Sequence, residues 1–297
     1  MGRLRLLFSV ENIFKFGTQE KSRMLRKKLK LDPIVQNNSI SIQHSTISDS
    51  TTTDLVQRIL EIEKNMCKSL ERLKFCSPVA YVYNPLQYAW EPHKEYVMKY
   101  CNSVKPIVFL GINPGPFGMC QTGVPFGQIN AVKNFLGIEK PVLKPEKECP
   151  SRTITGFNCT RSEISGERFW GYIQKLCGTS EKFFENAFVY NYCPLAFMKN
   201  NGTNVTPAEL PEASQRIIEE ICDEALLQIF NLLQVKKVIG IGRFSEKRAQ
   251  QVLKKSTLED VSIYFMPHPS PRVVNNQNWP QKAENFLKEN NLMDYFL

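Results

Sequence analysis

Hydrophobic positions along this chain form two kinds of pattern, short runs that are mostly or fully apolar and longer amphipathic stretches. The short runs predict buried strands at residues 106–110, 187–191, 237–241 and 262–266. The amphipathic stretches between them predict helices at residues 165–177, 210–233 and 245–255. Apolar strands that alternate with amphipathic helices are typical of a mostly parallel sheet covered on both faces. We therefore predict an α/β fold class, a three-layer α/β/α sandwich with a mostly parallel four-stranded central sheet.

A further helix is predicted before the first strand, with Asp54 as its N-cap. Its apolar positions recur at steps of three and four residues: Leu55, Ile59, Ile62, Met66, Leu70 and Leu73. The preceding segment, 37–54, is rich in Ser and Thr and poor in large apolar residues, which predicts a disordered linker. We expect residues 1–53 to form a tail and residues 54–297 to form one folded domain.

The apolar side of the helix predicted at residues 210–233 is expected to pack in the core and to carry no function. Its members are Ile217, Ile218, Ile221, Ala225, Leu226 and Ile229.

Basic residues are concentrated at the N-terminus. The formal net charge is +9, and residues 1–31 hold nine Lys or Arg against two Glu, which leaves +7 in this segment. The stretch "KSRMLRKKLK" resembles a nuclear-localisation or polyanion-binding arm, although a solvated basic extension explains it equally well. We expect a nuclear protein and keep a mitochondrial presequence as the alternative. No apolar run approaches the roughly 20 residues that span a bilayer, so no membrane partner is expected.

Cysteine and histidine usage argues against a disulfide framework and against a metal centre. The nine cysteines are scattered without a CxxC pair, which is typical of reduced thiols in a cytosolic or nuclear protein. The three histidines, His44, His93 and His268, are too far apart in sequence to form a local zinc motif. We expect neither a metal nor an organic cofactor.

Unusual segments follow three of the four predicted strands. "GINPGPFGMCQTGVPFG" begins at the end of the first strand, "NYCPL" follows the second and "HPSPR" follows the fourth. Because ligands of open α/β sheets bind beyond the carboxyl ends of the strands, these segments are expected to meet in one cleft. The third strand ends in "GIGRF", which is a poor match to a dinucleotide-binding motif.

The first of these segments contains no titratable side chain, which limits the chemistry it can perform. Asn113 can hold a water molecule by hydrogen bonds without deprotonating it. An un-ionised water suffices only when the leaving group departs largely on its own, as in glycosidic cleavage through a cationic transition state. His268 would then donate to the oxygen on which negative charge develops. The pattern favours hydrolysis of an N-glycosidic bond to a base that leaves as an anion.

Five segments together resemble one family. "GINPGPFGMCQTGVPFG", "SEISGERFWGYIQKLCG", "FVYNYCPL", "NVTPAELP" and "HPSPR", in this order along the chain, are similar to the single-strand-selective monofunctional uracil-DNA glycosylases of the uracil-DNA glycosylase superfamily. The resemblance extends from about Leu55 to the C-terminus. It implies a uracil-DNA glycosylase-like catalytic domain over residues 54–297. The implied reaction is release of uracil, 5-hydroxymethyluracil and related oxidised pyrimidines from single- and double-stranded DNA, which leaves an abasic site for base excision repair.

The resemblance also assigns roles to residues. Asn113 matches the asparagine that positions the water, and His268 matches the histidine that stabilises the departing uracil anion at O2. Phe126 matches the ring that stacks on the flipped base, and Asn191 matches the asparagine that recognises O4 and N3–H. The pocket wall is implied to include Ile112, where the family has methionine, together with Gly115 and Met119. In the family, space beside C5 admits a hydroxymethyl group and disfavours the methyl group of thymine.

The segments that the resemblance places on DNA differ in part from the family. The segment after "HPSPR" wedges into the duplex in the family, but here it reads "VVNNQN", about one residue shorter and without the family's Lys and second Pro. "KNNGTNVTP" matches a second DNA-facing loop. The implied DNA-binding residues are Arg272, Asn276, Asn201 and Asn204. DNA is the expected partner, and we expect a monomer.

Each role has a structural alternative. Asn113 can cap a turn, His268 can be an ordinary loop histidine, Phe126 can be core, and Asn191 can satisfy backbone groups at a strand end. At the level of function, a mismatch-specific thymine or uracil glycosylase and a non-catalytic nucleic-acid-binding protein stay open. An assay of base release from single strands, U·G pairs and G·T pairs separates them.

Overall fold

A four-stranded parallel sheet forms the centre of the part of the chain that the structure describes. The computed structural model describes the backbone from Thr46 to Leu297 and side chains from Thr53, so the predicted basic tail and its proposed roles lie outside the described residues. The strands follow the order β3-β2-β6-β7, and every neighbouring pair is parallel. Their bounds are Ile107–Gly111 for β2, Ala187–Asn191 for β3, Lys237–Ile241 for β6 and Ser262–Met266 for β7. The predicted fold class is confirmed, and only the first strand is shifted, by one residue.

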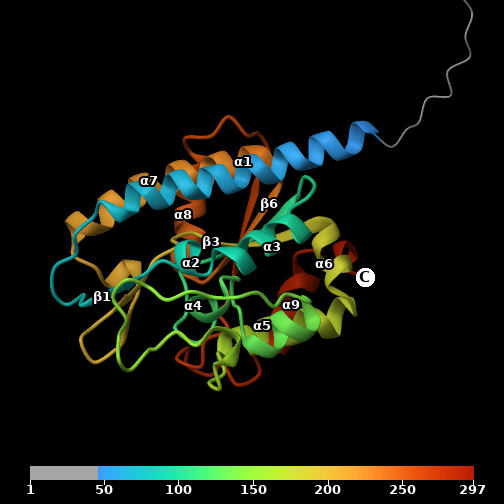
Figure 1. Cartoon of the computed structure of the whole chain (residues 1–297). Helices are drawn as coiled ribbons and strands as arrows, with labels where there is room; N and C mark the ends of the chain where they lie inside the picture. The colour runs from blue at the N-terminus through green and yellow to red at the C-terminus, as the bar shows by residue number, and fades with distance from the viewer. Residues whose placement is uncertain (1–45) are drawn as a thin grey trace, which may run out of the picture. The chain divides into compact units, whose positions relative to one another are not determined.

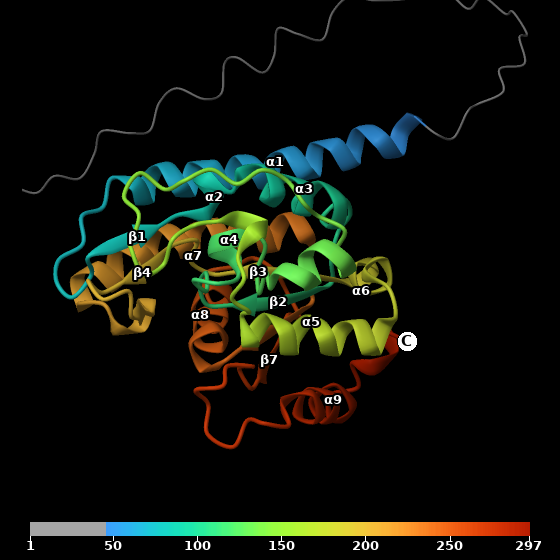
Figure 2. The same ribbon diagram turned by 60° about the horizontal axis from the view of Figure 1, so that its bottom comes forward.

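Helices cover both faces of this sheet, as the alternating pattern predicted. Figures 1 and 2 show α1 (Thr46–Glu71) and α7 (Glu212–Leu233) on one side, and α5 (Ile164–Cys177) and α9 (Trp279–Glu289) on the other. The strands β2 and β3 are buried along their whole length, because a helical layer lies on each side. The remaining helices are α2 (Pro85–Tyr88), α3 (Trp90–Tyr100), α4 (Met119–Thr122), α6 (Ser180–Asn186) and α8 (Arg243–Leu253).

A second, antiparallel sheet lies beside the main one and was not predicted. It consists of β1 (Tyr81–Tyr83), β4 (Ala196–Met198) and β5 (Asn204–Val205), in the order β1-β4-β5. Strands of two or three residues are too short to give a periodic signal in the sequence. The hairpin between β4 and β5 carries the "KNNGTNV" segment, so this small sheet positions one of the loops expected to contact DNA.

Two local predictions are wrong. The first helix begins at Thr46, within the predicted linker, and Asp54 is an interior residue that lies 3.7 Å from Arg58 one turn later, so it is not an N-cap. In α7, Ile217 is 45% exposed, whereas Ile218 and Leu226 are buried. One isoleucine of the predicted apolar stripe therefore lies outside the core-facing side of the helix.

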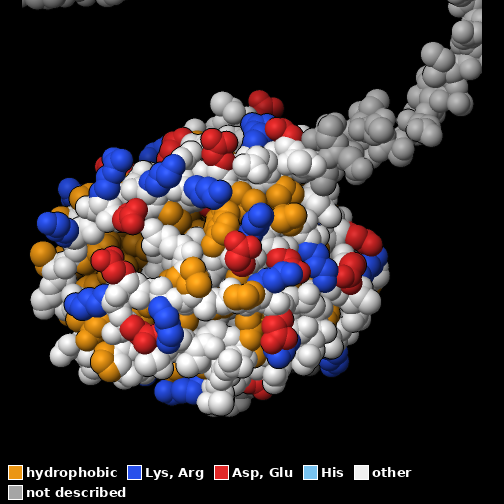
Figure 3. Space-filling model, in the orientation of Figure 1, with side chains coloured by type: hydrophobic (Ala, Val, Ile, Leu, Met, Phe, Trp, Pro, Cys, Tyr) orange, Lys and Arg blue, Asp and Glu red, His pale blue; other side chains and the backbone are white. Residues whose placement is uncertain are grey.

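Positive and negative side chains are mixed over the face that Figure 3 shows. A hollow at the left of this view coincides with a groove of about 480 Å³ lined by Leu70, Phe75, Val82, Leu143 and Lys147 among others. The groove contains none of the predicted site residues. Among the described residues, none of the helices is both long and apolar enough to cross a membrane.

Candidate active site

The segments that follow β2 and β3 remain paired beyond the ends of the strands. The backbone N–H of Tyr192 donates to the carbonyl of Gly111 at 3.0 Å, and that of Cys193 donates to the carbonyl of Ile112 at 2.9 Å. This pairing fixes the start of the "GINPG" loop against the "NYCPL" segment. Two of the three segments expected to meet at the sheet edge are thus in direct contact.

The side chain of Asn113 is held in one orientation. Its Nδ2 donates to the carbonyl of Leu195 at 3.0 Å, and because a carbonyl can only accept, the amide nitrogen must face Leu195. Its Oδ1 is left free to accept a hydrogen bond. Asn113 is half-buried, so a water molecule can reach that oxygen. An acceptor of this kind can orient a water without ionising it.

Asn191, Gly111 and Phe126 form a close group at the ends of β2 and β3. Gly111 lies opposite Asn191 in the strand register, and a Cβ on Gly111 would overlap the Asn191 Oδ1 and lie 3.1 Å from the Phe126 ring. Asn191 Nδ2 donates to the Met119 sulfur at 3.1 Å. Because a thioether is a weak acceptor, a base carbonyl can replace it at little cost. The amide of Asn191 therefore presents a donor and an acceptor beside an aromatic ring.

Phe126 is held in a strained backbone conformation by α5. Its φ is 52°, in the left-handed region that costs a residue with a Cβ about 1–2 kcal/mol. Its ring stacks on Phe169 at 4.8 Å between centroids and 20° between planes, and its carbonyl faces Gly166. The strain persists because the helix packs directly on this residue. The centroid of the Phe126 ring also lies 6.0 Å from that of the His268 ring.

A matched pair of glycine substitutions tests this support. A Cβ on Gly166 would overlap the Phe126 carbonyl, whereas a Cβ on Gly171 of the same helix would meet nothing within 4 Å. We expect Gly166→Ala to lower the free energy of unfolding by about 1–3 kcal/mol and to reduce activity by displacing Phe126. Gly171→Ala is expected to raise stability by about 0.5–1 kcal/mol. Urea unfolding measures both, and equal effects of the two substitutions would contradict the packing described.

His268 is neutral, and its tautomer is defined by the backbone. The N–H of Ser270 donates to Nδ1 at 3.1 Å, so the ring proton lies on Nε2, which is then a hydrogen-bond donor. Burial lowers the pKa of His268 to about 4, because the charged ring is not solvated there. A neutral donor of this kind can stabilise an oxygen anion in a partly buried pocket.

Nuclear magnetic resonance of the imidazole nitrogens tests this assignment. We expect the His268 signals to show the Nε2–H tautomer and no titration between about pH 5.5 and 8, because its pKa is about 4. The unfolded chain takes up this proton near pH 6.5, so this group lowers the stability of the fold as the pH falls from 6.5 towards 4. A midpoint above about 6, or the other tautomer, would contradict the geometry.

The third strand also contributes to the site, which the sequence did not indicate. Gly242 follows β6 with φ of 93°, and a Cβ built on it would lie 3.6 Å from the His268 Cβ and 4.0 Å from the Ile112 Cδ1. Ile112 and His268 therefore approach the same glycine. The "GIGRF" segment thus lies against the loop that carries His268, a contact that the sequence pattern of this segment does not predict.

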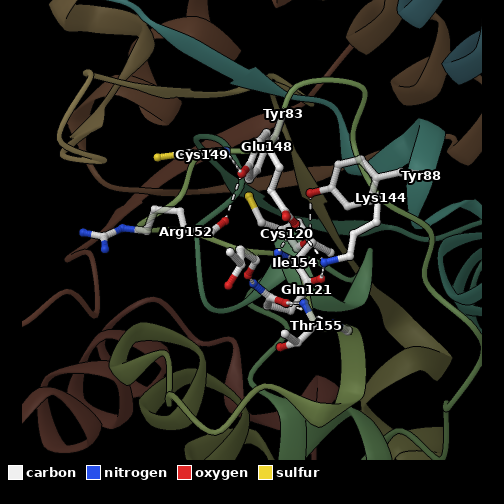
Figure 4. Close-up of polar contacts among 12 residues, drawn as sticks. Tyr83, Tyr88, Cys120, Gln121, Lys144, Glu148, Cys149, Arg152, Ile154 and Thr155 are labelled. Atoms are coloured by element: carbon white, nitrogen blue, oxygen red, sulfur yellow. Dashed lines mark hydrogen bonds and ion pairs between the residues drawn. The ribbon is translucent and has the colours of Figure 1, made fainter.

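The rest of the first segment forms a tight turn that is tied to residues 144–156. The carbonyl of Gly115 accepts from the N–H groups of Gly118 and Cys120 at 3.3 and 3.1 Å. Figure 4 shows the surrounding network, in which the Tyr88 hydroxyl donates to the Cys120 carbonyl at 2.8 Å. Gln121 bonds three backbone groups there, the carbonyl of Thr153 and the N–H groups of Thr155 and Gly156. Gly115 and Met119 are thus parts of a rigid wall.

The four predicted DNA-binding residues lie in two places and differ in exposure. Arg272 is exposed and, among the described residues, has no carboxylate within 4 Å. Asn276 is only 2% exposed, and its Nδ2 donates to the carbonyls of His268 and Ser270 at 2.9 Å each. In this conformation Asn276 braces the histidine loop rather than facing solvent. Val274, which carried no assignment, is 82% exposed at the tip of the same segment.

Asn201 and Asn204 lie on the β4–β5 hairpin. Asn201 is exposed, and its Oδ1 accepts from the N–H of Thr203 at 3.0 Å. Asn204 is half-buried, and its Oδ1 has no hydrogen-bond partner. Two bonds from Thr206 lower the pKa of the nearby Glu209, and the charges of Lys199 and Arg272 lower it further. Glu209, which follows the hairpin, therefore lies within electrostatic range of both Lys199 and Arg272.

Within residues 46–297, none of the His, Cys, Asp and Glu side chains form a group of three or more that could hold a metal ion. The residues brought together at the site are instead hydrogen-bonding and aromatic. They offer a water acceptor at Asn113, a neutral donor at His268, an amide edge at Asn191 and a stacking ring at Phe126. This set can bind a flat heterocycle and stabilise negative charge on one of its oxygens.

Comparisons with known proteins show which sequences and structures this chain is similar to. The profile of the Uracil DNA glycosylase superfamily matches residues 98–292. A Mus musculus protein named single-strand selective monofunctional uracil DNA glycosylase is 46% identical over 243 residues, 82% of this chain and 87% of its own. The Rattus norvegicus protein of the corresponding name is 44% identical over 250 residues, 84% of this chain and 90% of its own. The crystal structure of wild-type SMUG2 from Pedobacter heparinus aligns with a TM-score of 0.58 at 18% identity, over 80% of this chain and 98% of that one.

Proposed function

The chain belongs to the single-strand selective monofunctional uracil-DNA glycosylases of the uracil DNA glycosylase superfamily, and from this premise we propose its substrates and the roles of its residues. It is a hydrolase of N-glycosyl bonds that acts on uracil in DNA. The proposed substrates are uracil and 5-hydroxymethyluracil in single strands and in duplexes. The proposed product is an abasic site in an otherwise intact strand.

Binding begins with extrusion of the target nucleotide, which costs a few kcal/mol of stacking and pairing and least in single strands. The flipped base stacks on Phe126, which replaces part of the lost stacking. Asn191 donates from Nδ2 to O4 and accepts N3–H at Oδ1, so cytosine, with an amino group at C4 and no N3–H, is a poor fit. The exposed loop residues Arg272 and Asn201 are proposed to hold the DNA backbone.

Cleavage of the glycosidic bond then separates the sugar from the base, and different groups of the site act on each. The bond between C1′ and N1 lengthens first, so positive charge develops on the sugar and negative charge on the base. The Nε2–H of neutral His268 donates to O2 of the departing uracil anion. Asn113 Oδ1 holds the water that adds to C1′. As the new C–O bond forms, the water gives one proton to solvent, and the uracil anion takes one proton from solvent to leave as free uracil. "GINPGPFGMCQTGVPFG" and "HPSPR" contain no lysine, so no Schiff base and no strand cleavage are expected.

The observation that supports this proposal is the complementary hydrogen bonding of Asn113 and His268, which follow β2 and β7 beyond the carboxyl edge of one parallel sheet. Asn113 keeps a free acceptor because Leu195 binds its nitrogen, and His268 keeps a free donor because Ser270 binds its Nδ1. A non-catalytic binding protein needs neither arrangement. A mismatch-specific glycosylase is disfavoured by the names of the curated relatives, which describe single-strand selective enzymes.

A panel of substrates in the presence of EDTA tests the proposal. Release of the free base is measured from uracil and 5-hydroxymethyluracil in one single-stranded sequence, from the same lesions paired with guanine, and from a G·T control. We expect both lesions to be released without metal and thymine to be retained. Release of thymine at a comparable rate would favour the mismatch-specific class, and binding without release would favour the non-catalytic class.

Val274 gives a test of duplex penetration. Its side chain is 82% exposed, and we propose that it enters the gap left by the flipped nucleotide. Val274→Ser is expected to slow uracil release from a U·G duplex by about tenfold while release from single strands stays within about twofold. Ile217→Ser, at another exposed apolar position, is the matched control. Equal effects of Val274→Ser on single and double strands would contradict the wedge role.

A further inference from the structure

The carboxyl group of Glu163 lies inside the turn that follows β2 and has no partner there. Glu163 is the N-cap residue of α5, but its side chain makes no capping bond. It turns instead towards Gly115 and Gly118, where a Cβ on Gly118 would overlap the carboxyl and a Cβ on Gly115 would lie 2.8 Å from Oε2. Oε2 is fully buried without a hydrogen-bond partner. An unpaired buried carboxyl oxygen is uncommon and calls for an explanation.

This carboxyl lies next to the groups that surround the base. Gly118 precedes Met119, whose sulfur contacts Asn191, and α5 supplies the Phe169 ring that supports Phe126. The two glycines leave room for the carboxyl, since any side chain at Gly115 or Gly118 would occupy the same space. The Glu163 carboxyl therefore fills the space that side chains at positions 115 and 118 would otherwise fill, and it forms part of the wall there.

The turn around Glu163 is not free to move away. The Tyr88 hydroxyl holds the Cys120 carbonyl, and Gln121 Nε2 donates to the carbonyls of Pro116 and Thr153 at 3.1 and 3.0 Å. Cys120 and Gln121 are themselves completely buried. The turn around the carboxyl is thus held rigidly. A rigid site can discriminate between ligands that differ by one small group.

The edge of the base that faces this wall follows by elimination. On the proposed function, O2 is bound by His268 and the O4 and N3 edge is bound by Asn191, so only C5 and C6 remain for the wall of Gly115, Gly118 and Met119. We infer that Glu163 is a specificity-determining residue, whose carboxyl hydrogen-bonds a polar substituent on C5 and disfavours a methyl group there. This inference rests on the proposed function and adds a residue to its site.

The chemistry of the carboxyl suits a hydroxymethyl substituent. Burial raises the pKa of Glu163 to about 7, so both protonation states are accessible near neutral pH. The acid donates to the substituent oxygen, and the carboxylate accepts from its hydroxyl proton. The methyl group of thymine can do neither and would leave the carboxyl buried without a partner. The hydrogen of uracil at C5 leaves room for a water molecule instead.

The ratio of two rates tests this inference. The value of kcat/KM is measured for 5-hydroxymethyluracil and for uracil in the same single-stranded sequence. For Glu163→Leu we expect the ratio of the two to fall at least about tenfold, with uracil release within about threefold of wild type. Glu163→Gln keeps both a donor and an acceptor and is expected to hold the ratio within about threefold. Matched changes at exposed Glu167 on the same helix, Glu167→Leu and Glu167→Gln, should leave the ratio unchanged.

The outcomes separate this inference from the proposed function. If wild type releases both bases and Glu163→Leu leaves the ratio unchanged, or lowers both rates equally, the role of Glu163 is wrong and the proposed function stands. If wild type releases uracil alone, the role of Glu163 and the wider substrate range both fail. Should Glu163→Leu not fold, as judged by its circular dichroism spectrum, Glu163→Ala gives the same test because it only removes atoms.

Discussion

Replacing Asn113 with alanine is expected to slow uracil release from single-stranded DNA by about 10²–10³-fold, with DNA affinity within about twofold of wild type. The substitution removes the oxygen that orients the water but none of the groups that contact the base. The effect should therefore appear in the single-turnover rate rather than in binding. Rates from quenched-flow experiments and affinities from fluorescence anisotropy measure the two separately.

Asn186 provides a matched control for this substitution. Its Nδ2 also donates to a backbone carbonyl, that of Tyr295, at 3.0 Å, but it lies just before β3, at the amino end of the sheet. Asn186→Ala should leave the rate of uracil release unchanged. Asn113→Asp is expected to retain more activity than Asn113→Ala, because a carboxylate still offers the water an acceptor. A wild-type rate in Asn113→Ala would show that the water is held by another group.

Replacing His268 with leucine is expected to lower the rate of uracil release by about 10²–10³-fold. Leucine fills a similar volume but donates no hydrogen bond, so the uracil anion loses the donor at O2. His268→Gln should be less severe, because its amide nitrogen can donate to the same oxygen. The loss should be smaller for a substrate whose base is a better leaving group, such as 5-fluorouracil. An equal loss for both bases would contradict stabilisation of the leaving group by His268.

The architecture was predictable because the strands of the main sheet carry strong signals. Residues 107–110 and 187–190 are continuous apolar runs, as is typical of strands buried on both faces. The same signals predict that Asn113, Asn191 and His268 follow strands at one edge, because parallel strands end at a common edge of the sheet, and the structure has this strand arrangement, whereas the roles of the three residues stay predictions. The strands of the small antiparallel sheet gave no signal, because none exceeds three residues.

Contacts made by helices across the site were not predictable. Glu163 and Gly166 lie in "SEISGERFWG". A carboxylate at a helix start is ordinarily solvent-exposed, and a glycine within a helix ordinarily only lowers the stability of that helix. The structure turns Glu163 into the glycine-rich turn and packs Gly166 on the Phe126 carbonyl. Asn276 was also not predictable. Its place in a loop suggests an exposed side chain, but its amide is buried and binds the carbonyls of His268 and Ser270.

The most direct test of the central claim compares two single-turnover rates of free uracil release from one single-stranded oligonucleotide. One rate is that of the wild-type chain and the other is that of the Asn113→Ala, His268→Leu double variant, at DNA concentrations that saturate both. We predict that wild type frees uracil in EDTA and leaves the strand uncut, while the double variant is slower by at least about 10³-fold. A double variant that keeps about a tenth of the wild-type rate or more would contradict the account, because neither residue could then carry the chemistry assigned to it.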